Sequence, residues 1–342
     1  MKTIVIVNTQ LQLLNSIECL SHLNINRADI ILYAQGRKRM YQLNKLLELD
    51  VINSFFYKVY RITNYFKKDR IIPWLTFLFI WFVCKKNKYD NCIIGHYMFS
   101  TSKHLIRMCR KYNPQVNIYV VDDGMASLTI AESRIRELQT RDPISSMAIE
   151  GRLLRLYMKS RSEQYIAPKL TFFSVFNQLN NSKDRFIYNK YDFIKKNCYN
   201  ISINQYFREA EIVILGQPLN DSLGYSNYLK YIAKVFELNI NCKILYYPHP
   251  EEKINENTFS SFSNIKVVKN DYSIELISLL LPNCKKIIGF YTSALVTLQY
   301  FCPDIELQSI VVSSKDVNEK YFPIYEKCYK NFEKRGITLL KF

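Results

Sequence analysis

The chain has 342 residues, of which 48% are hydrophobic, and its formal net charge is +17. This length suits two domains of roughly 150 residues each better than one compact core. The 26 Tyr and 21 Phe, set against eight Gly and ten Pro, exclude an intrinsically disordered chain.

The first half of the chain alternates strand and helix patterns. Strands are predicted at residues 3–7, 29–34, 90–97 and 116–124, and helices at 11–23, 38–49 and 101–112, the last capped by Ser100 or Thr101. Continuous apolar strands separated by helices indicate a parallel sheet that is covered on both faces.

Residues from about 140 to 205 lose this alternation, although 152–165 reads as a basic helix, and the stretch is interpreted as an irregular excursion. The alternation returns with predicted strands at 210–219, 242–250, 264–269, 284–291 and 305–312. Helices are predicted at 225–238, 273–281, 293–301 and 317–334, and Pro323 is expected to kink the last one.

The sequence therefore predicts an α/β fold with two Rossmann-like open parallel-sheet domains that face each other across a cleft. The first domain would span 1–205 and the second domain 206–342, with the last helix expected to pack back on the first domain. Ligands of such sheets bind at the carboxyl ends of the strands.

The positive charge predicts an anionic partner, and an anionic membrane surface is favoured over nucleic acid. The basic residues are spread along the chain, and no RNA-recognition, zinc-finger or helix-turn-helix pattern occurs. Residues 71–86 are almost wholly apolar and end in Lys85 and Lys86, but they are too short to span a bilayer. They are interpreted either as a buried core helix, as a dimer contact, or as a helix in the membrane interface with Trp74 and Trp81 at headgroup depth.

The nine cysteines are odd in number and form no C-x-x-C pair, which is typical of reduced thiols in a cytosolic protein. The N-terminus reads as a strand and lacks the apolar core of a signal peptide.

Four of the eight glycines stand at the exits of predicted strands and mark the candidate functional edge: Gly95, Gly124, Gly216 and Gly289. At the first-domain exit "VVDDGMAS", Asp122 and Asp123 are adjacent carboxylates whose repulsion favours a general base. Capping of the next helix is the structural alternative.

In the second domain, His249 stands between Pro248 and Pro250 directly after a strand. A histidine fixed there can donate a proton or face a phosphate. Thr292 and Ser293 stand where a helix begins, which is a typical phosphate site, with simple capping as the alternative.

Two further strand exits carry polar residues. In the second domain, Gly216 and Gln217 leave a strand, and Asp221 follows as a rival base or as a helix cap. On the acceptor side, the candidates follow the first and third predicted strands: Asn8, Thr9, Gln12 and His96.

Several catalytic classes lack their motifs in this sequence. No zinc-ligand spacing, D-x-D, P-loop or G-x-G-x-x-G occurs, so kinases, NTPases and dinucleotide enzymes are not expected.

The "DDG" of the first domain and the "HP" of the second, on tandem α/β domains, resemble the bacterial sialyltransferases of the lipooligosaccharide sialyltransferase family, glycosyltransferase family 52. "NTQLQLLNS" is similar to the start of these enzymes, with Thr9-Gln10 in place of Ser-Pro, and "TSAL" is similar to their nucleotide-phosphate element. The resemblance covers nearly the whole chain except about 140–205.

This resemblance implies a GT-B fold and an inverting transfer of sialic acid from CMP-sialic acid to a galactose-terminated glycan of lipooligosaccharide, capsule or O-antigen. His249, Thr292 and Ser293 would contact the leaving phosphate, and the remaining donor-side positions would be Gly216, Gln217, Pro248, Pro250 and Gly289. The base would be Asp122 or Asp123, with Asp221 as the alternative.

Neither a cofactor nor a metal is expected. The enzyme would lie in the cytoplasm, peripherally on the inner face of the cytoplasmic membrane, with a homodimer as an open option. Two alternatives stay open: a GT-B transferase for another nucleotide sugar such as a UDP-hexose, and a non-catalytic anion-binding protein at the membrane surface.

Overall fold

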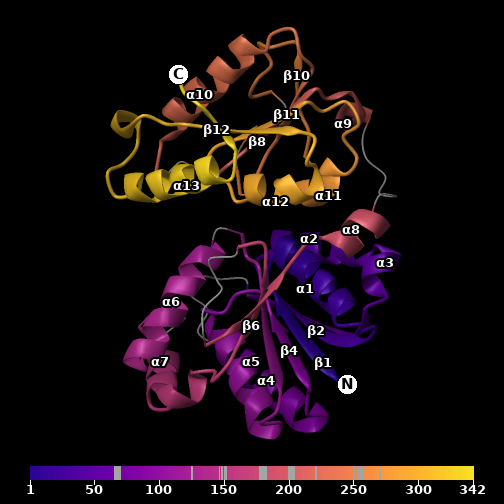
Figure 1. The fold of residues 1–342 in the computed structure, drawn as a ribbon, viewed down its shortest axis with the longest axis vertical. Helices are drawn as coiled ribbons and strands as arrows, with labels where there is room; N and C mark the ends of the chain where they lie inside the picture. The colour runs from indigo at the N-terminus through magenta and orange to yellow at the C-terminus, as the bar shows by residue number, and fades with distance from the viewer. Residues whose placement is uncertain are drawn as a thin grey trace. The chain divides into compact units, whose positions relative to one another are not determined.

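A computed structural model describes residues 1–64, 71–124, 126–145, 147, 149, 152–176, 183–198, 205–219, 222–249, 251–252, 254, 257–269 and 271–342. The chain divides into two compact units, Met1–Asn197 and Cys198–Phe342 (Figure 1). The division falls eight residues before the boundary expected from the sequence, and residues 199–204 lie outside the described ranges.

Unit 1 contains a seven-stranded parallel sheet in the order β3-β2-β1-β4-β5-β6-β7. Its strands are β1 (Thr3–Val7), β2 (Ala28–Gln35), β3 (Phe56–Asn64), β4 (Asn91–Ile94), β5 (Asn117–Val121), β6 (Thr171–Ser174) and β7 (Arg185–Tyr188). Every residue of β1 and β4 is buried, as expected for central parallel strands with helices on both faces.

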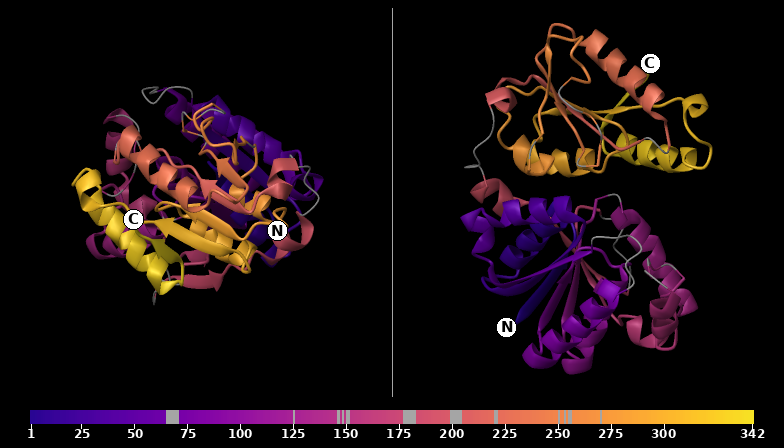
Figure 2. Two further views of the ribbon diagram at one scale, coloured as in Figure 1. Left: turned by 90° about the horizontal axis from the view of Figure 1, so that it is seen from above. Right: turned by 180° about the vertical axis from the view of Figure 1, so that it is seen from behind.

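The helices of unit 1 lie on both faces of this sheet. They are α1 (Gln10–His22), α2 (Arg37–Leu47), α3 (Asp50–Asn53), α4 (Ile71–Asn87), α5 (Ser100–Tyr112), α6 (Ala126–Thr140), α7 (Arg152–Lys159) and α8 (Asp192–Asn197), with a 3-10 turn at Ser162–Tyr165. Helices α1 and α2 cover one face, and α4 and α5 cover the other (Figures 1 and 2).

Unit 2 contains a six-stranded parallel sheet in the order β10-β9-β8-β11-β12-β13. Its strands are β8 (Ile212–Leu215), β9 (Ile244–Tyr247), β10 (Ile265–Val267), β11 (Lys286–Gly289), β12 (Glu306–Ile310) and β13 (Thr338–Leu340). Its helices are α9 (Gln205–Glu209), α10 (Tyr225–Leu238), α11 (Ile274–Ser278), α12 (Ala294–Phe301) and α13 (Phe322–Lys334), with a 3-10 turn at Ser314–Asp316. Helix α10 lies on one face of the sheet, and α11, α12 and α13 lie on the other (Figure 2).

The two sheets share one topological feature that positions the candidate residues. In unit 1 the strand order reverses between β1 and β4, and in unit 2 it reverses between β8 and β11. The loops after these strands diverge to opposite faces, which leaves a crevice at the carboxyl ends where ligands of open α/β sheets bind.

The structure confirms the tandem parallel-sheet architecture and corrects three local predictions. Residues 140–205 are not only an excursion, because β6 and β7 extend the sheet of unit 1 there. Pro323 does not kink a helix, because α13 begins beside it, where proline needs no backbone N–H partner. Neither Ser100 nor Thr101 caps α5, because the cap position is Phe99.

No helix within the described ranges is long and apolar enough to cross a membrane. All nine cysteines are free, and all but Cys242 are buried, as the spacing predicts.

Candidate active site

In unit 1, the predicted acceptor-side residues gather at the switch point between β1 and β4. Asn8 and Thr9 follow β1, and Gln12 lies in the first turn of α1, where the Thr9 hydroxyl accepts a hydrogen bond from its backbone N–H (3.3 Å). The Gln12 side-chain carbonyl in turn accepts from the Asn8 N–H at 2.7 Å. These bonds fix the loop as one unit, and Asn8 Nδ2 ties it to β2 by donating to the Tyr33 carbonyl at 2.8 Å.

Gly95 follows β4 directly and lies against the Gln12 side chain. A Cβ atom at this position would overlap the Gln12 amide. The glycine at this strand exit is therefore required by a side chain of the neighbouring loop, which is a specific reason for a scarce residue to stand there.

Asp122 is buried and accepts hydrogen bonds from two other segments of unit 1. Its carboxylate accepts hydrogen bonds from the Ser174 hydroxyl and, at 2.8 Å, from the Val175 N–H, and its carbonyl accepts from Asn15 Nδ2 at 3.0 Å. These donors, two of them from the end of β6, join β6 to the end of β5. The structure thus places Asp122 as a brace between strands.

Asp123 differs from its neighbour because 18% of its side chain is exposed. Burial raises its pKa to about 7, Gln12 and Arg39 act in the opposite direction, and the charge of Asp122 adds to the increase. Its backbone N–H donates to the Ser127 hydroxyl at 3.1 Å. A carboxyl that titrates near neutral pH at a ligand-binding edge can serve as a general base.

His96 provides the neighbouring polar group. Its Nε2 lies 3.6 Å from Asp123 Oδ2, and its Nδ1 accepts a hydrogen bond from the Met98 N–H at 3.2 Å. Burial lowers the pKa of His96 to about 4, so the ring is neutral at pH 7. With Nδ1 occupied as an acceptor, the ring proton is on Nε2 and points toward Asp123.

In unit 2, His249 follows β9 and Pro248 with a fixed ring nitrogen. The Glu251 N–H donates to His249 Nδ1 at 3.1 Å, which leaves the ring proton on Nε2. The backbone of His249 is also held, because its N–H donates to Glu252 Oε2 at 3.0 Å and its carbonyl accepts from the Glu252 N–H at 2.9 Å. The residue is half-buried.

Glu252 connects the His249 loop to the rest of the switch point in unit 2. Its Oε1 accepts from the Tyr246 hydroxyl at 2.6 Å, and that hydroxyl lies 2.6 Å from the Tyr228 hydroxyl. The Tyr228 hydroxyl accepts the Gln217 N–H at 3.1 Å, so the network reaches the loop after β8. Burial raises the pKa of Glu252, and its hydrogen bonds lower it.

Gly216 explains why this network can form. A Cβ atom at Gly216 would overlap the Glu252 carboxylate and come within 2.8 Å of the Tyr246 hydroxyl. Sequence reasoning left Glu252 without a role. The available signal was its place three residues after His249, together with a glycine at the adjacent strand exit.

The third group of unit 2 lies after β11, beside β8 in the sheet. Ser293 occupies the cap position of α12 without a side-chain hydrogen bond to the helix, whereas the Thr292 hydroxyl accepts the Ala294 N–H at 3.3 Å. Gly289 is packed on Thr292, whose Cγ2 would lie 2.8 Å from an added Cβ. The half-buried Ser293 hydroxyl and the positive end of the α12 dipole suit an anion, whereas the first N–H groups of the helix donate to Thr292 and Ser293.

The predicted residues that the structure describes form one group in unit 1 and two groups in unit 2. Asn8, Thr9, Gln12, His96 and Asp123 lie together in unit 1, and Glu252 links Gly216, Gln217 and His249 in unit 2. Asp221 and Pro250 lie outside the described residues. Across the described ranges, no group of three or more His, Cys, Asp or Glu side chains is arranged to hold a metal ion.

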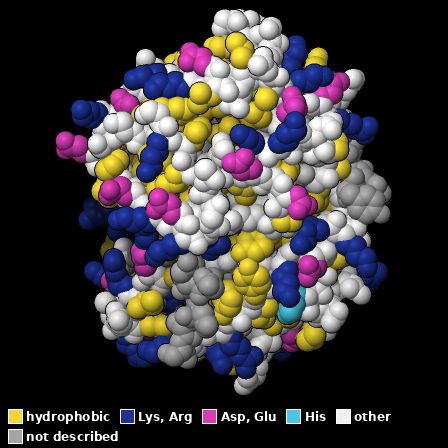
Figure 3. Space-filling view, turned by 45° about the horizontal axis from the view of Figure 1, so that its top comes forward, with side chains coloured by type: hydrophobic (Ala, Val, Ile, Leu, Met, Phe, Trp, Pro, Cys, Tyr) yellow, Lys and Arg dark blue, Asp and Glu magenta, His cyan; other side chains and the backbone are white. Residues whose placement is uncertain are grey.

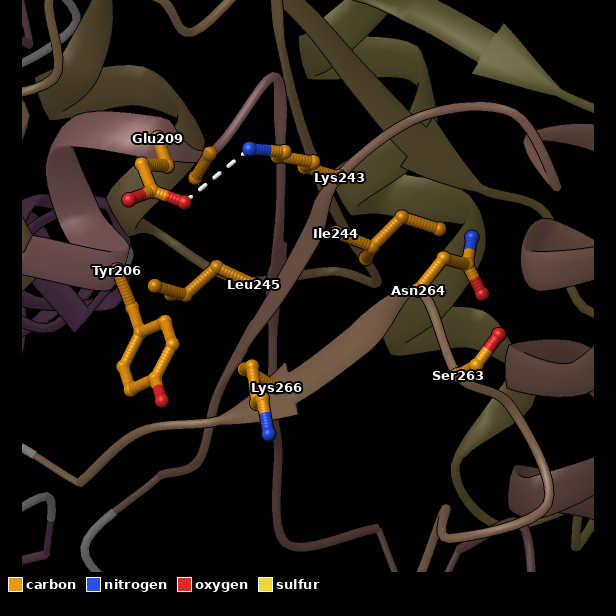
Figure 4. Close-up of a pocket in the computed structure, with 9 residues that line it drawn as sticks. Tyr206, Glu209, Lys243, Ile244, Leu245, Ser263, Asn264 and Lys266 are labelled. Carbon is orange, nitrogen blue, oxygen red and sulfur yellow. Dashed lines mark hydrogen bonds and ion pairs between the residues drawn. The ribbon is translucent and has the colours of Figure 1, made fainter.

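A separate pocket of about 180 Å³ lies at the opposite end of β9 (Figure 4). Lys243, Ile244, Tyr206 and Lys266 contribute to its lining, and Lys243 Nζ is 3.1 Å from Glu209 Oε2. No predicted site residue lines it. It faces the amino ends of the strands, so it is not part of the candidate active site.

Two tandem parallel sheets, each with polar residues at its switch point, define a GT-B-like fold. The sequence model of the alpha-2,8-polysialyltransferase family matches residues 4–311. The chain belongs to this family and is a glycosyltransferase. No curated protein matches its sequence.

Solved structures similar to this chain agree with the fold. The UDP-GlcNAc 2-epimerase of Methanocaldococcus jannaschii is 14% identical, with 97% of this chain and 92% of the epimerase covered and a TM-score of 0.54. The UDP-GlcNAc 2-epimerase of Neisseria meningitidis is 13% identical (84% and 77% covered, TM-score 0.53). An alpha/beta-galactoside alpha-2,3-sialyltransferase of Photobacterium phosphoreum is 14% identical (91% of each chain covered, TM-score 0.50). At these identities the similarity shows the fold alone.

Proposed function

We propose that this glycosyltransferase moves sialic acid from CMP-sialic acid to a glycan hydroxyl with inversion, and that Asp123 is the general base. Membership in the alpha-2,8-polysialyltransferase family supports the transferred sugar. The observation that carries the mechanism is the Asp123 carboxyl, which is partly exposed at a switch point with a pKa of about 7. The more specific assignment to glycosyltransferase family 52 stays a prediction.

In this proposal, unit 1 activates the acceptor. Asp123 removes the proton of the attacking hydroxyl, and the Nε2–H of neutral His96 orients that hydroxyl or the carboxylate. Asp122 is already committed to Ser174 and Val175, so its role is to hold the strand end. Asp221 stays an alternative base that these contacts do not address.

Unit 2 stabilises the leaving group. CMP departs as a phosphate monoester, which needs hydrogen-bond donors and positive potential more than a strong acid. His249 offers its Nε2–H, because Nδ1 is held by the Glu251 N–H. Ser293 and the N-terminus of α12 offer a hydroxyl and the positive end of a helix dipole.

Two acceptor classes follow from two different observations. The motif resemblance favours a galactose-terminated glycan of lipooligosaccharide, capsule or O-antigen. The family description favours the end of an α-2,8-linked sialic acid chain. The chemistry assigned to Asp123 and His249 is the same for both, because each acceptor supplies one hydroxyl.

A donor and acceptor panel tests the proposal. The full chain is assayed with CMP-sialic acid and with UDP-hexoses, each offered to lactose and to oligosialic acid, with and without EDTA. Product from CMP-sialic acid that persists in EDTA is expected. Reaction with UDP-hexoses alone would overturn the donor assignment, and thermal stabilisation by CMP provides an independent readout of binding.

A further inference from the structure

Helix α4 in unit 1 is apolar on both of its faces, the buried one and the exposed one. One face is buried in the unit through Phe77, Ile80 and Cys84. The other face is exposed, with Leu75, Leu78 and Phe82 showing 57%, 61% and 57% of their surface. The spacing of three and four residues places these exposed side chains in one stripe along the helix.

Helix α7 lies beside α4 and adds to this exposed surface. The Tyr157 ring of α7 contacts the Trp74 ring of α4 edge-on, with centroids 5.3 Å apart. Leu153 and Leu156 of α7 are 70% and 53% exposed. Contiguous apolar surface of this kind is rare on soluble proteins unless something covers it.

The same two segments are strongly basic. Residues 71–88 and 152–161 contain seven Lys and Arg and no Asp or Glu: Lys85, Lys86, Lys88, Arg152, Arg155, Lys159 and Arg161. Elsewhere the charge is scattered, and on the face drawn in Figure 3 basic side chains are mixed with acidic and apolar ones. Helices α4 and α7 thus combine exposed apolar side chains with cations in a segment pair that has no acidic residue.

We propose that α4 and α7 form a docking face for an anionic phospholipid bilayer. The apolar stripe would enter the boundary between headgroups and acyl chains, and the seven cations would lie against lipid phosphates. Trp81, with 38% of its surface exposed and Lys85 Nζ at 5.1 Å from its ring centroid, suits the headgroup layer. The proposal is independent of the reaction proposed above.

Charge distinguishes this occupant from a second copy of the chain. In a twofold dimer the same patch meets itself, so seven cations would face seven cations across an apolar contact. An anionic bilayer instead neutralises them while it covers the leucines. Helix α4 has 17 residues, fewer than the roughly 20 of a spanning helix, and no helix among the described residues is long and apolar enough to cross a bilayer.

Vesicle flotation tests the docking face. The full chain is mixed with vesicles of phosphatidylcholine, or of phosphatidylcholine with phosphatidylglycerol. Binding to the anionic vesicles, weakened by added salt, is expected. The triple variant Leu75→Asn/Leu78→Asn/Phe82→Asn should lower the partition coefficient by at least about 100-fold, and Lys85→Glu/Lys86→Glu by at least about 10-fold.

The matched control is Leu238→Asn/Ile240→Asn, which removes two side chains of similar exposure (66% and 65%) at the end of α10 in unit 2. This variant should bind vesicles like the original chain. Circular dichroism melting of every variant separates loss of docking from loss of folding. Equal binding to both vesicle types, or unchanged binding by the folded triple variant, would overturn the proposal. So would a dimer that the triple variant abolishes.

Discussion

The switch points of the two units have the same topology, but one carries a proton acceptor and the other a hydrogen-bond donor. In unit 1, burial raises the pKa of Asp123 to about 7, so its carboxylate can accept a proton near neutral pH. In unit 2, hydrogen bonds to the Glu252 carboxylate and from the Glu251 N–H fix His249 so that it presents a donor. One sheet edge is thus suited to take a proton and the other to bind a leaving anion.

Glycine serves the same purpose at both edges. Gly95 admits the Gln12 side chain, and Gly216 admits the Glu252 carboxylate. In each case a polar side chain crosses the exit of a neighbouring strand and holds the loop that carries the reactive group. Both sites are therefore organised by side chains, Gln12 and Glu252, that need not touch a substrate themselves.

Removal of the base in unit 1 should have the largest effect. Asp123→Asn is expected to lower kcat/KM by about 10²–10⁴-fold, because the proton acceptor is lost. The original enzyme should gain activity as pH rises through about 7, and the variant should lose that dependence. Steady-state kinetics from about pH 5.5 to about pH 9 measures both effects.

The same substitution should stabilise the fold. The folded-state pKa of Asp123 lies above its value of about 4 in an unfolded chain, so the folded state disfavours the ionised form. Its contribution to stability is present below pH 4 and is lost as pH rises through about 7. Asp123→Asn should therefore raise Tm at pH 8, whereas Asp122→Asn should lower it, because asparagine keeps only one of the two oxygens that accept from Ser174 and Val175. Exposed Asp192→Asn serves as the control, and full activity of Asp123→Asn would exclude it as the base.

Removal of the donor in unit 2 should have the next largest effect. His249→Ala is expected to lower kcat/KM by about 10²-fold and to weaken CMP binding, because the leaving phosphate loses the Nε2–H. His22→Ala replaces an exposed histidine in unit 1 and should leave both quantities unchanged. Donor titration and CMP calorimetry measure the effects, and normal turnover by His249→Ala would contradict the assignment.

The two glycines allow the two edges to be separated. Gly216→Ala should weaken CMP binding by about tenfold, because the new methyl group displaces Glu252 and with it the His249 loop. Gly95→Ala should instead raise the acceptor KM by a similar factor through Gln12. Binding of CMP and acceptor kinetics are measured for both variants. Identical effects of the two substitutions on both ligands would show that the edges do not act separately.

The smallest effect should come from Glu252→Gln. Glutamine keeps the size of Glu252 and one acceptor oxygen, but it must leave either the Tyr246 hydroxyl or the His249 N–H without a carboxylate acceptor. A loss of roughly threefold to tenfold in CMP affinity is expected, with kcat nearly unchanged. Glu252→Ala should lose more. A fall in Tm without any change in CMP affinity would assign Glu252 to stability instead of positioning.

Much of this organisation could be predicted from local patterns. Apolar runs such as that of β1 predict buried parallel strands, and glycines after β4, β8 and β11 predict functional turns, because both signals depend on neighbours in the chain. The strands β6 and β7 were missed because they are four residues each and their pairing with β5 is specified by sheet order rather than by a period.

The sequence by itself determined the two α/β units, the strand ends that carry "DDG" and "HP", and a basic chain with an apolar helix in its first half. The tertiary structure adds that Asp122 accepts hydrogen bonds from the end of β6, whereas the pKa of Asp123 is raised to about 7. It also shows that Glu252 accepts from the His249 N–H and that α4 has an exposed apolar stripe. The physical reason is that burial and side-chain pairing join residues from different strands, and no pattern along one segment contains that information.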